Sequence, residues 1–216
     1  MLIVEKQPKS IPAESYRTLR TNIQYSSFDK EIDRILVTSS EPGEGKSTTA
    51  GNLALAFSQD EKKVLLIDCD LRKPSIHKKF RISNNIGLSD VVIDSSKFSK
   101  AVIHHTEYLD VLPSGKIPPN PSELLGSKAM ENLLNELQKH YDLIILDTPP
   151  VHAVTDAQIL STKVDGVVLV VRAERTKKDS VASAKASLEK VNANILGVVL
   201  NGGERSSGKY YYYYAD

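Results

Sequence analysis

The sequence contains no tryptophan, a single cysteine and no apolar run long enough to cross a membrane. The lone Cys69 excludes an internal disulfide framework and is consistent with a reducing compartment. The apolar run at residues 167–171 has strand length, whereas a membrane-spanning helix needs about 20 apolar residues. The three apolar residues at 2–4 are too few for the core of a signal peptide. We therefore expect a cytoplasmic protein.

An excess of charge of one sign is also absent. The 28 Lys and Arg residues balance 27 Asp and Glu residues, which leaves a formal net charge of +1. Without an overall basic field, the composition gives no reason to expect nucleic acid or an anionic membrane surface as a partner. The hydrophobic fraction of 40% and the length of 216 residues are ordinary for one large globular domain.

Short apolar runs alternate with stretches of helix length. The runs show no period of two, which is typical of strands buried on both faces of a parallel sheet. Helix-length stretches separate most of them, and this βαβ order predicts an α/β fold with a doubly wound, mostly parallel sheet flanked by helices. The expected strands are 35–38, 64–68, 143–147, 167–171 and 195–200, and the expected helices are 46–59, 122–140, 155–163 and 178–191.

The two ends of the chain depart from this repeat. Pro12 and the good helix formers after it predict a helix at about 12–26, before the first strand. Gly, Ser and charged residues dominate from residue 202, so we expect a domain over 1–201 and a flexible tail over 202–216. A proline-rich loop at 113–121 precedes a helix for which we expect Ser122 as the N-cap.

The most informative segment is the glycine-rich run at residues 39–49, between the first strand and the following helix. Backbone N–H groups of such a loop and the helix N-terminus bind phosphate, a lysine neutralises the β and γ oxygens, and a hydroxyl binds Mg²⁺. Here Lys46 and Ser47 would do so, although Ser40 replaces the first glycine of the strict motif. A glycine-rich turn without function is the alternative. The residues expected to contact ATP are Gly43, Glu44, Gly45, Lys46, Ser47, Thr48 and, at the last strand, Asn201.

Acidic residues follow two further strands. Asp68 and Asp70 share one face as the second strand ends, and Asp147 ends another strand. Ligands of open α/β sheets bind at the carboxyl ends of the strands, so all three acids are expected beside the loop. They are candidates to hold hydrated Mg²⁺ and to accept a proton, but capping of the next helix explains Asp68 and Asp70 equally well.

These three motifs together resemble the Walker A, A′ and B set of the bacterial tyrosine kinases of capsule and exopolysaccharide synthesis. The resemblance implies ATP and Mg²⁺ as cofactors, with Ser47, Asp70 and Asp147 on the metal side. Switch ATPases of division-site and plasmid-partition type usually have an extra lysine where this chain has Glu41. The catalytic residues implied by the resemblance are Lys46, Asp68, Asp70, Arg72 and Asp147.

The family also has a helical E-x-x-R-x-x-R motif for assembly, which Glu14, Arg17 and Arg20 match. Spacing alone favours an ordinary salt-bridge ladder on one helix face. The resemblance instead implies a head-to-tail ring, often of eight subunits, in which the tail of one subunit enters its neighbour's site. It further implies a transmembrane activator of the polysaccharide copolymerase type, which would recruit the kinase to the inner face of the membrane, and a cognate tyrosine phosphatase.

The chain ends in a run of five tyrosines, Tyr210, Tyr211, Tyr212, Tyr213 and Tyr214. A phenol cluster on a flexible tether resembles the substrate of such a kinase, although a buried aromatic strand and low-complexity adhesion are alternatives. Full deprotonation of a phenol, with a pKa of about 10, by an aspartate of pKa about 4 would be uphill by roughly 8 kcal/mol. Asp68 is therefore expected to accept the proton as transfer proceeds, while Arg72 steadies either the acids or the γ-phosphate.

Two other functions compete with the kinase. One is a switch ATPase that hydrolyses ATP to control assembly; Glu41 and the tyrosine run argue against it. The other is a nucleotide-sensing regulatory subunit of a polysaccharide-synthesis complex, which would bind ATP without transferring phosphate. Intact Lys46, Asp68, Asp70 and Asp147 argue against a dead site.

Overall fold

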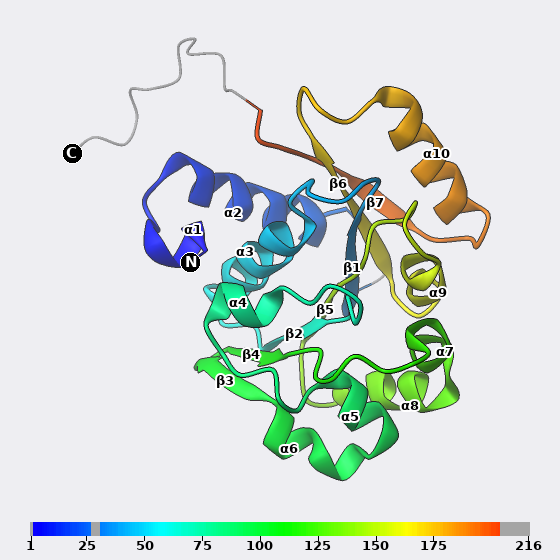
Figure 1. Ribbon diagram of the computed structural model, residues 1–216. Helices are drawn as coiled ribbons and strands as arrows, with labels where there is room; N and C mark the ends of the chain where they lie inside the picture. Colours follow the sequence, from blue (N-terminus) through cyan, green and yellow to red (C-terminus); the bar gives the residue numbers. More distant parts are fainter. Residues whose placement is uncertain (1, 27–30, 204–216) are drawn as a thin grey trace.

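The computed structural model describes residues 2–26 and 31–203, and it forms a single seven-stranded sheet (Figure 1). The strands lie in the order β3-β4-β2-β5-β1-β6-β7, and all pairs are parallel except the edge pair β3 and β4. The predicted doubly wound fold and all five predicted strands are confirmed. The strands are β1 (Arg34–Ser39), β2 (Val64–Asp68), β3 (Ile103–Thr106), β4 (Leu109–Leu112), β5 (Leu143–Asp147), β6 (Gly166–Arg172) and β7 (Ile195–Asn201).

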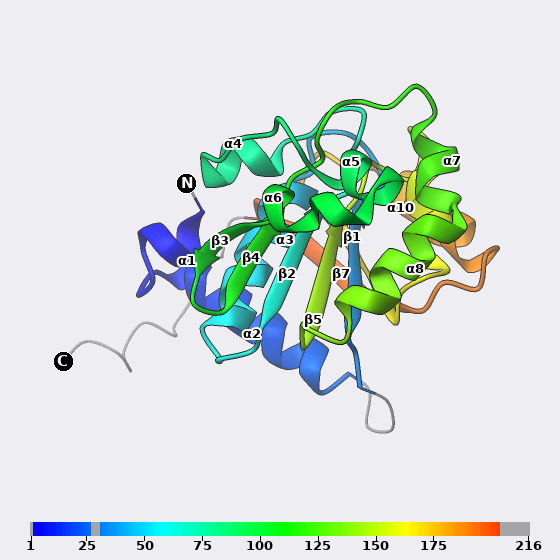
Figure 2. The same ribbon diagram turned by 90° about the horizontal axis from the view of Figure 1, so that it is seen from below.

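Helices cover both faces of the sheet (Figures 1 and 2). One face packs against α1 to α4 and the other against α5 and α7 to α10. The helices are α1 (Ile3–Lys6), α2 (Ile11–Gln24), α3 (Lys46–Ser58), α4 (Ile76–Phe80), α5 (Leu88–Ile93), α6 (Phe98–Ala101), α7 (Pro121–Gly126), α8 (Lys128–Leu137), α9 (Asp156–Ser161) and α10 (Lys178–Glu189), with a 3₁₀ turn, η1, at Ser95–Lys97.

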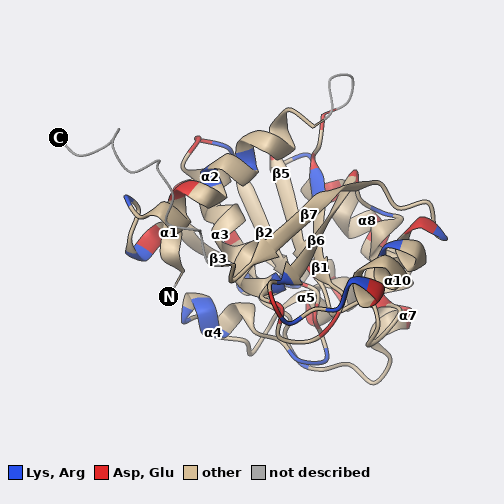
Figure 3. Cartoon of the chain, turned by 90° about the horizontal axis from the view of Figure 1, so that it is seen from above, with Lys and Arg blue, Asp and Glu red and all other residues tan. Residues whose placement is uncertain are grey.

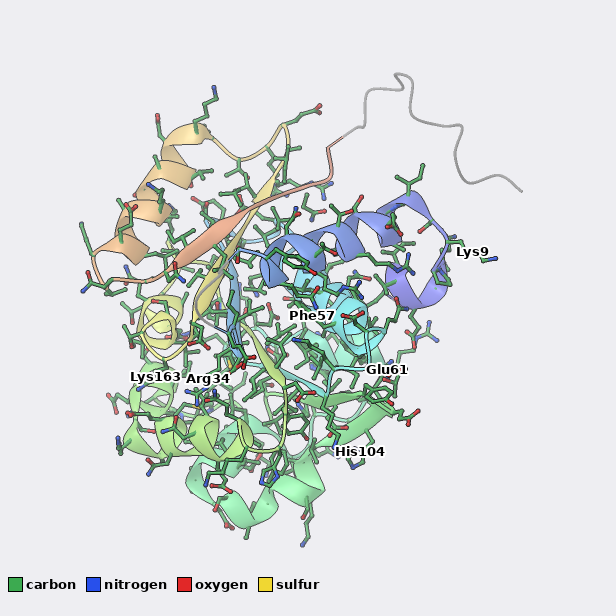
Figure 4. All side chains as sticks on the ribbon, turned by 180° about the vertical axis from the view of Figure 1, so that it is seen from behind. Lys9, Arg34, Phe57, Glu61, His104 and Lys163 are labelled. Atoms are coloured by element: carbon green, nitrogen blue, oxygen red, sulfur yellow. The ribbon has the colours of Figure 1, made fainter. Side chains whose placement is uncertain are left out.

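The central strands contribute to two cores because successive side chains lie on opposite faces. On β1, Ile35 packs with the α2 and α3 layer, while Leu36 packs with α8 and α9. Phe57 of α3 lies inside the first core, whereas Lys9 projects away from the body of the molecule (Figure 4). Burial on both faces explains why these strands contain unbroken apolar runs.

The helix predicted at 12–26 is α2, which begins slightly earlier. Ser10 is its N-cap and accepts a hydrogen bond from the Ala13 backbone N–H at 3.3 Å, with Pro12 in the first turn. Across residues 2–26 and 31–203, no helix has both the length and the apolar character needed to cross a bilayer. Most of the expected tail, including its five tyrosines, lies outside the described residues.

The predicted helix at 122–140 is wrong in one respect, because it is two helices. Gly126 ends α7, and Ser127 then caps α8 by accepting a hydrogen bond from the Met130 N–H at 3.1 Å. The expected capping role of Ser122 is also wrong. Pro121 suits a first helical position, so α7 starts one residue earlier, after Asn120, and the Ser122 side chain bonds elsewhere.

Candidate active site

The glycine-rich loop lies between β1 and α3, and two of its glycines adopt backbone conformations that other residues rarely adopt. Gly43 has φ +83° and Gly45 has φ +97°. A Cβ atom on Gly45 would also lie 1.9 Å from the Asn201 side-chain nitrogen. Both the turn and this close approach therefore require glycine at position 45.

Residues from β7 and from the segment after β6 support the loop. The Asn201 side-chain amide donates to the Glu44 carbonyl oxygen at 2.8 Å, and the Thr176 hydroxyl donates to the Glu44 carboxylate. Ser180 of α10 donates to Glu41 at 2.9 Å. The expected contact of Asn201 with adenine stays a prediction; the structure adds that Asn201 braces the loop.

Lys46 lies among the carboxylates that the sequence placed beside the loop. Its Nζ is 2.8 Å from Asp70 Oδ2, 3.8 Å from Asp147 Oδ1 and 3.3 Å from the Ser47 hydroxyl. Burial lowers the pKa of Lys46, but Asp147 and Asp70 outweigh burial and hold the pKa above its ordinary value. Lys46 is therefore a charged cation at the loop, paired with acids that are themselves largely buried.

Asp147 has the features of a carboxylate built to receive a cation. Its side chain is fully buried, and neither oxygen has a hydrogen-bond partner within the described part of the chain. Burial raises its pKa, although Lys46 acts in the opposite direction. Such an unsatisfied buried acid is costly unless a ligand compensates it. Ser47, which follows Lys46 in the loop motif, would contribute a hydroxyl oxygen to a cation bound there.

These residues fit magnesium better than a metal that needs a full protein cage. Among residues 2–26 and 31–203 there is no group of three or more His, Cys, Asp or Glu side chains arranged to hold a metal. Mg²⁺ keeps several waters and typically takes one or two carboxylates together with substrate phosphates. Asp147, Asp70 and Ser47 supply that kind of incomplete set.

Asp68 caps the start of α4, as one of the two interpretations of the sequence expected, and it also lies close to Asp70 and Asp147. Its Oδ2 accepts backbone N–H bonds from Ser75 and Ile76, both at 3.0 Å, at the start of α4, and its Oδ1 accepts one from Asp70 at 3.2 Å. Burial and the nearby Asp147 raise its pKa to about 7. An acid with a pKa near neutrality is well suited to general-base work.

Arg72 lies elsewhere than expected. Its guanidinium contacts the fully buried Asp156 of α9 at 3.1 Å and the Ser122 hydroxyl at 2.9 Å. Ser122 in turn donates to Asp156 at 2.6 Å. Arg72 therefore neutralises a buried acid at the start of α9, and the structure gives no contact with Asp68, Asp70 or Asp147. The expectation that it steadies those acids is therefore wrong, and the alternative, that it steadies the γ-phosphate, stays a prediction.

A second lysine near the loop was missed in the sequence. Lys79 of α4 donates to the Thr48 hydroxyl at 2.8 Å, and burial lowers its pKa. Asp147 and Lys46 are near enough to influence that pKa as well, so Lys79 belongs to the same electrostatic environment. The basic run at residues 77–79 was its only signal, and a short basic run most often lies on a solvated surface.

We expect Lys79→Met to weaken ATP binding about three- to tenfold, because a half-buried positive charge is lost beside the loop. Calorimetry with ATP measures the effect. Lys63→Met is the matched control, since Lys63 is exposed and lies at the start of β2, the opposite end of that strand from Asp68. Equal dissociation constants for the two variants would contradict a role for Lys79.

The expected assembly motif divides into two separate contacts on α2. Glu14 and Arg17 form an exposed i,i+3 ion pair at 2.9 Å. Arg20 instead donates to the Ala56 carbonyl oxygen at the end of α3, at 3.0 Å, and lies 3.5 Å from Asp60. The ladder expected from spacing therefore includes only the first two residues.

Comparison with known proteins decides the family. A family model described as an AAA domain matches residues 33–196. Tyrosine-protein kinase YwqD of Bacillus subtilis is 49% identical over 214 residues, which cover 99% of this chain and 90% of the relative. Putative tyrosine-protein kinase CapB of Staphylococcus aureus is 42% identical over 218 residues, 100% of this chain and 96% of the relative. The chain belongs to the bacterial tyrosine kinases.

Solved structures agree with this assignment. The kinase domain of Escherichia coli tyrosine kinase ETK superposes with a TM-score of 0.90 at 36% identity, covering 98% of this chain and 84% of that one. The chimerical protein CapA2B2 superposes with a TM-score of 0.88 at 47% identity, covering 92% of this chain and 88% of that one. An McdA–ATP complex from Cyanothece gives only 0.65 at 25% identity, over 79% and 70%. This bacterial tyrosine kinase thus shares a fold with an ATP-binding protein of another kind but is much closer in structure to the kinase domains.

Proposed function

We propose that this tyrosine kinase transfers the γ-phosphoryl group of MgATP to tyrosines 210–214 of a neighbouring copy of itself, and that this transfer regulates capsular or exopolysaccharide synthesis and export. The observation that supports this most directly is the site around Lys46. It combines a loop for phosphates, a buried unsatisfied Asp147 and an Asp68 with a pKa of about 7. Phosphoryl transfer needs positioning and charge neutralisation above all.

The residues divide the work as follows. Lys46 neutralises phosphate oxygens, and residues 43–48 surround the phosphates. Ser47, Asp70 and Asp147 would hold Mg²⁺, which when bound spreads the developing charge of the phosphates. Asp68 accepts the phenol proton. With a pKa of about 7 instead of about 4, full proton transfer from a phenol of pKa about 10 is uphill by only roughly 4 kcal/mol.

The Glu41 side chain favours the kinase over a switch ATPase. At the position where switch ATPases have an extra lysine, this chain has a carboxylate whose oxygen accepts a hydrogen bond from Ser180 of α10. A lysine there would lose that bond and place a further positive charge at the rim of the loop. The switch ATPase and the nucleotide-sensing subunit are therefore the two alternatives that the following experiment distinguishes from the kinase.

The test is intact-mass spectrometry after incubation with MgATP. Successive additions of phosphate that map to Tyr210 through Tyr214 support the proposal. ADP release at unchanged mass would indicate a switch ATPase, and binding of ATP with neither product would indicate a nucleotide sensor. A parallel sample contains a peptide from the cytoplasmic tail of the membrane activator, so that a dependence on activation is not mistaken for inactivity.

The proposed assembly is a head-to-tail ring, with eight copies as the expected number, held in part by Glu14, Arg17 and Arg20. Glu14 is exposed and available to a neighbour, whereas Arg17 also donates to the Pro8 carbonyl oxygen and Arg20 binds α3. We further propose a cytoplasmic kinase that a transmembrane activator recruits to the inner face of the membrane and that a tyrosine phosphatase resets. Co-purification of the kinase with that activator's cytoplasmic segment tests the recruitment.

Phosphorylation should dissociate the ring. Each phosphotyrosine adds about −1.5 to −2 charges, so five of them add roughly −8 to −10 to a chain whose formal charge is +1. Once all five tyrosines carry phosphate, the tails repel one another and lose affinity for the acid-rich site, because no unmodified phenol remains to occupy it. Light scattering coupled to gel filtration should show a fall from ring to monomer mass, and unchanged mass after complete phosphorylation would contradict the prediction.

A further inference from the structure

A wide-open surface cavity of about 730 Å³ lies beside the acidic site and has no role in the function proposed above. Its wall comes from the segment between β2 and α4, from α4 itself and from the loop after β4. That volume is ample for one phosphorylated side chain. The polar side chains of its lining are those of Lys73, Ser75, His77, Lys78, Asn84 and Lys116.

The charged side chains that line this cavity are all positive, and we call it the basic cavity. Lys73, Lys78 and Lys116 line it, and none of them has an ion-pair partner within the described residues. No Asp or Glu is among the lining residues. Figure 3 shows in blue the Lys residues of α4, the helix that forms part of the cavity wall. Three unpaired lysines around one hollow create a local positive field in a chain whose net charge is only +1.

Part of the wall is held in place by hydrogen bonds. The Asn84 side chain accepts from the Gly115 N–H at 3.0 Å and donates to the Gly115 carbonyl oxygen at 3.1 Å. Ser89 donates to the Lys116 carbonyl oxygen at 2.6 Å. His77, a further lining residue, has a buried Nδ1 without a hydrogen-bond partner within the described residues. The cavity therefore has a backbone wall that hydrogen bonds hold in place.

The basic cavity also adjoins the acids that would act on tyrosine. The Lys73 N–H donates to Asp70 at 3.0 Å, and the Ser75 N–H donates to Asp68 at 3.0 Å. The segment that lines the cavity is thus the segment that bonds to the catalytic acids. An extended peptide advances about 3.3–3.6 Å per residue, so a tyrosine one or two positions from the reacting one is within reach of the cavity.

We propose that the basic cavity binds a phosphotyrosine of the tail while a neighbouring tyrosine of the same tail occupies the site at Asp68. This inference rests on the proposed phosphorylation of the tail. Five adjacent tyrosines make each product a neighbour of the next substrate. The dianionic phosphate pairs with Lys73, Lys78 and Lys116, whereas an unmodified phenol gains nothing from them. Modification of one tyrosine therefore favours modification of the next.

A binding experiment tests the cavity without catalysis. Fluorescence anisotropy measures the affinity of the full chain, dephosphorylated beforehand, for labelled peptides of sequence GKYYYYYAD with no or one phosphotyrosine. We expect the phosphopeptide to bind at least tenfold more tightly. The Lys78→Ala/Lys116→Ala variant should remove that preference, and Lys63→Ala should retain it. Equal affinity of the double variant and the wild type for the phosphopeptide would overturn the proposal.

A competition experiment identifies the ligand chemistry. Free phosphotyrosine should displace the labelled phosphopeptide, and inorganic phosphate should do so only at much higher concentration. If inorganic phosphate and free phosphotyrosine compete equally well, the cavity is an unspecific anion site and the proposal fails. Both variants replace exposed lysines, and their thermal unfolding midpoints verify that they fold.

The kinetic consequence separates this inference from the proposed kinase activity. Intact-mass spectra over time should show that the double variant gains its first phosphate at the wild-type rate but accumulates singly modified chains. If the wild type gains no phosphate at all, the proposed tail phosphorylation fails, while the binding experiment still reports on the cavity. Identical distributions of phosphate number in the wild type and the double variant would contradict the role of the cavity.

Discussion

Replacement of Lys46 by Met should reduce transfer of phosphate to the tail by at least a hundredfold. The lysine ammonium is the positive charge of the loop motif, and it lies within 4 Å of Asp70 and Asp147. Loss of a single group that stabilises developing charge typically costs about 10²–10³ in rate. Intact-mass spectrometry with MgATP measures the number of phosphates per chain as a function of time.

The substitution will also affect stability, and the control has to account for it. Without Lys46, the carboxylates of Asp70 and Asp147 lose their cation, so we expect a lower unfolding midpoint. Lys63→Met makes the same substitution at an exposed lysine and should change neither the phosphorylation rate nor the unfolding midpoint. Circular dichroism at the assay temperature verifies that the variant is folded. A folded Lys46→Met protein that phosphorylates at the wild-type rate would refute the assignment.

Asp147→Asn should lower the phosphorylation activity without lowering the stability of the nucleotide-free protein. The carboxylate is fully buried with neither oxygen hydrogen-bonded in the described structure, and its charge raises the pKa of Asp68. Removal of that charge relieves a desolvation cost, and Lys46 keeps its closer partner Asp70 at 2.8 Å, so the unfolding midpoint should stay the same or rise. Tail phosphorylation should fall at least a hundredfold, because the proposed Mg²⁺ ligand is lost.

Calorimetry distinguishes this explanation from general damage. In the absence of nucleotide, differential scanning should show an Asp147→Asn protein at least as stable as the wild type. In the presence of MgATP, only the wild type should gain stability from the ligand. A marked loss of stability in the nucleotide-free variant would mean that Asp147 supports the fold and is not primarily a ligand for the cation.

The parts of this structure that the sequence predicted share a local cause. Strands buried on both faces need unbroken apolar runs, and the phosphate loop needs glycines at fixed spacing, so both are visible in short segments. The edge strand β3 was missed because its sequence, Ile-His-His-Thr, is half exposed and polar. The short helices α4 to α6 have too few turns for a clear helical period.

The contacts that were missed join residues far apart in the chain. Arg72 and Asp156 are 84 positions apart, and Asn201 and Glu44 are 157 positions apart. Neither pair belongs to a motif whose spacing could reveal it. Which of several acids an arginine neutralises depends on how α9 packs against the sheet, and that packing is decided by the whole core. The place of Arg72 could therefore be seen only in the folded chain.

Asn201 gives the tail a mechanical connection to the nucleotide site. This residue ends β7, holds the Glu44 carbonyl group of the loop and stands directly before the segment that leads to the tyrosines. If the proposed ring forms and a neighbouring subunit takes up the tail, the strand from which the tail leaves is the strand whose last side chain braces the phosphate loop. Donation of the tail and use of the subunit's own ATP site would then be coupled through β7.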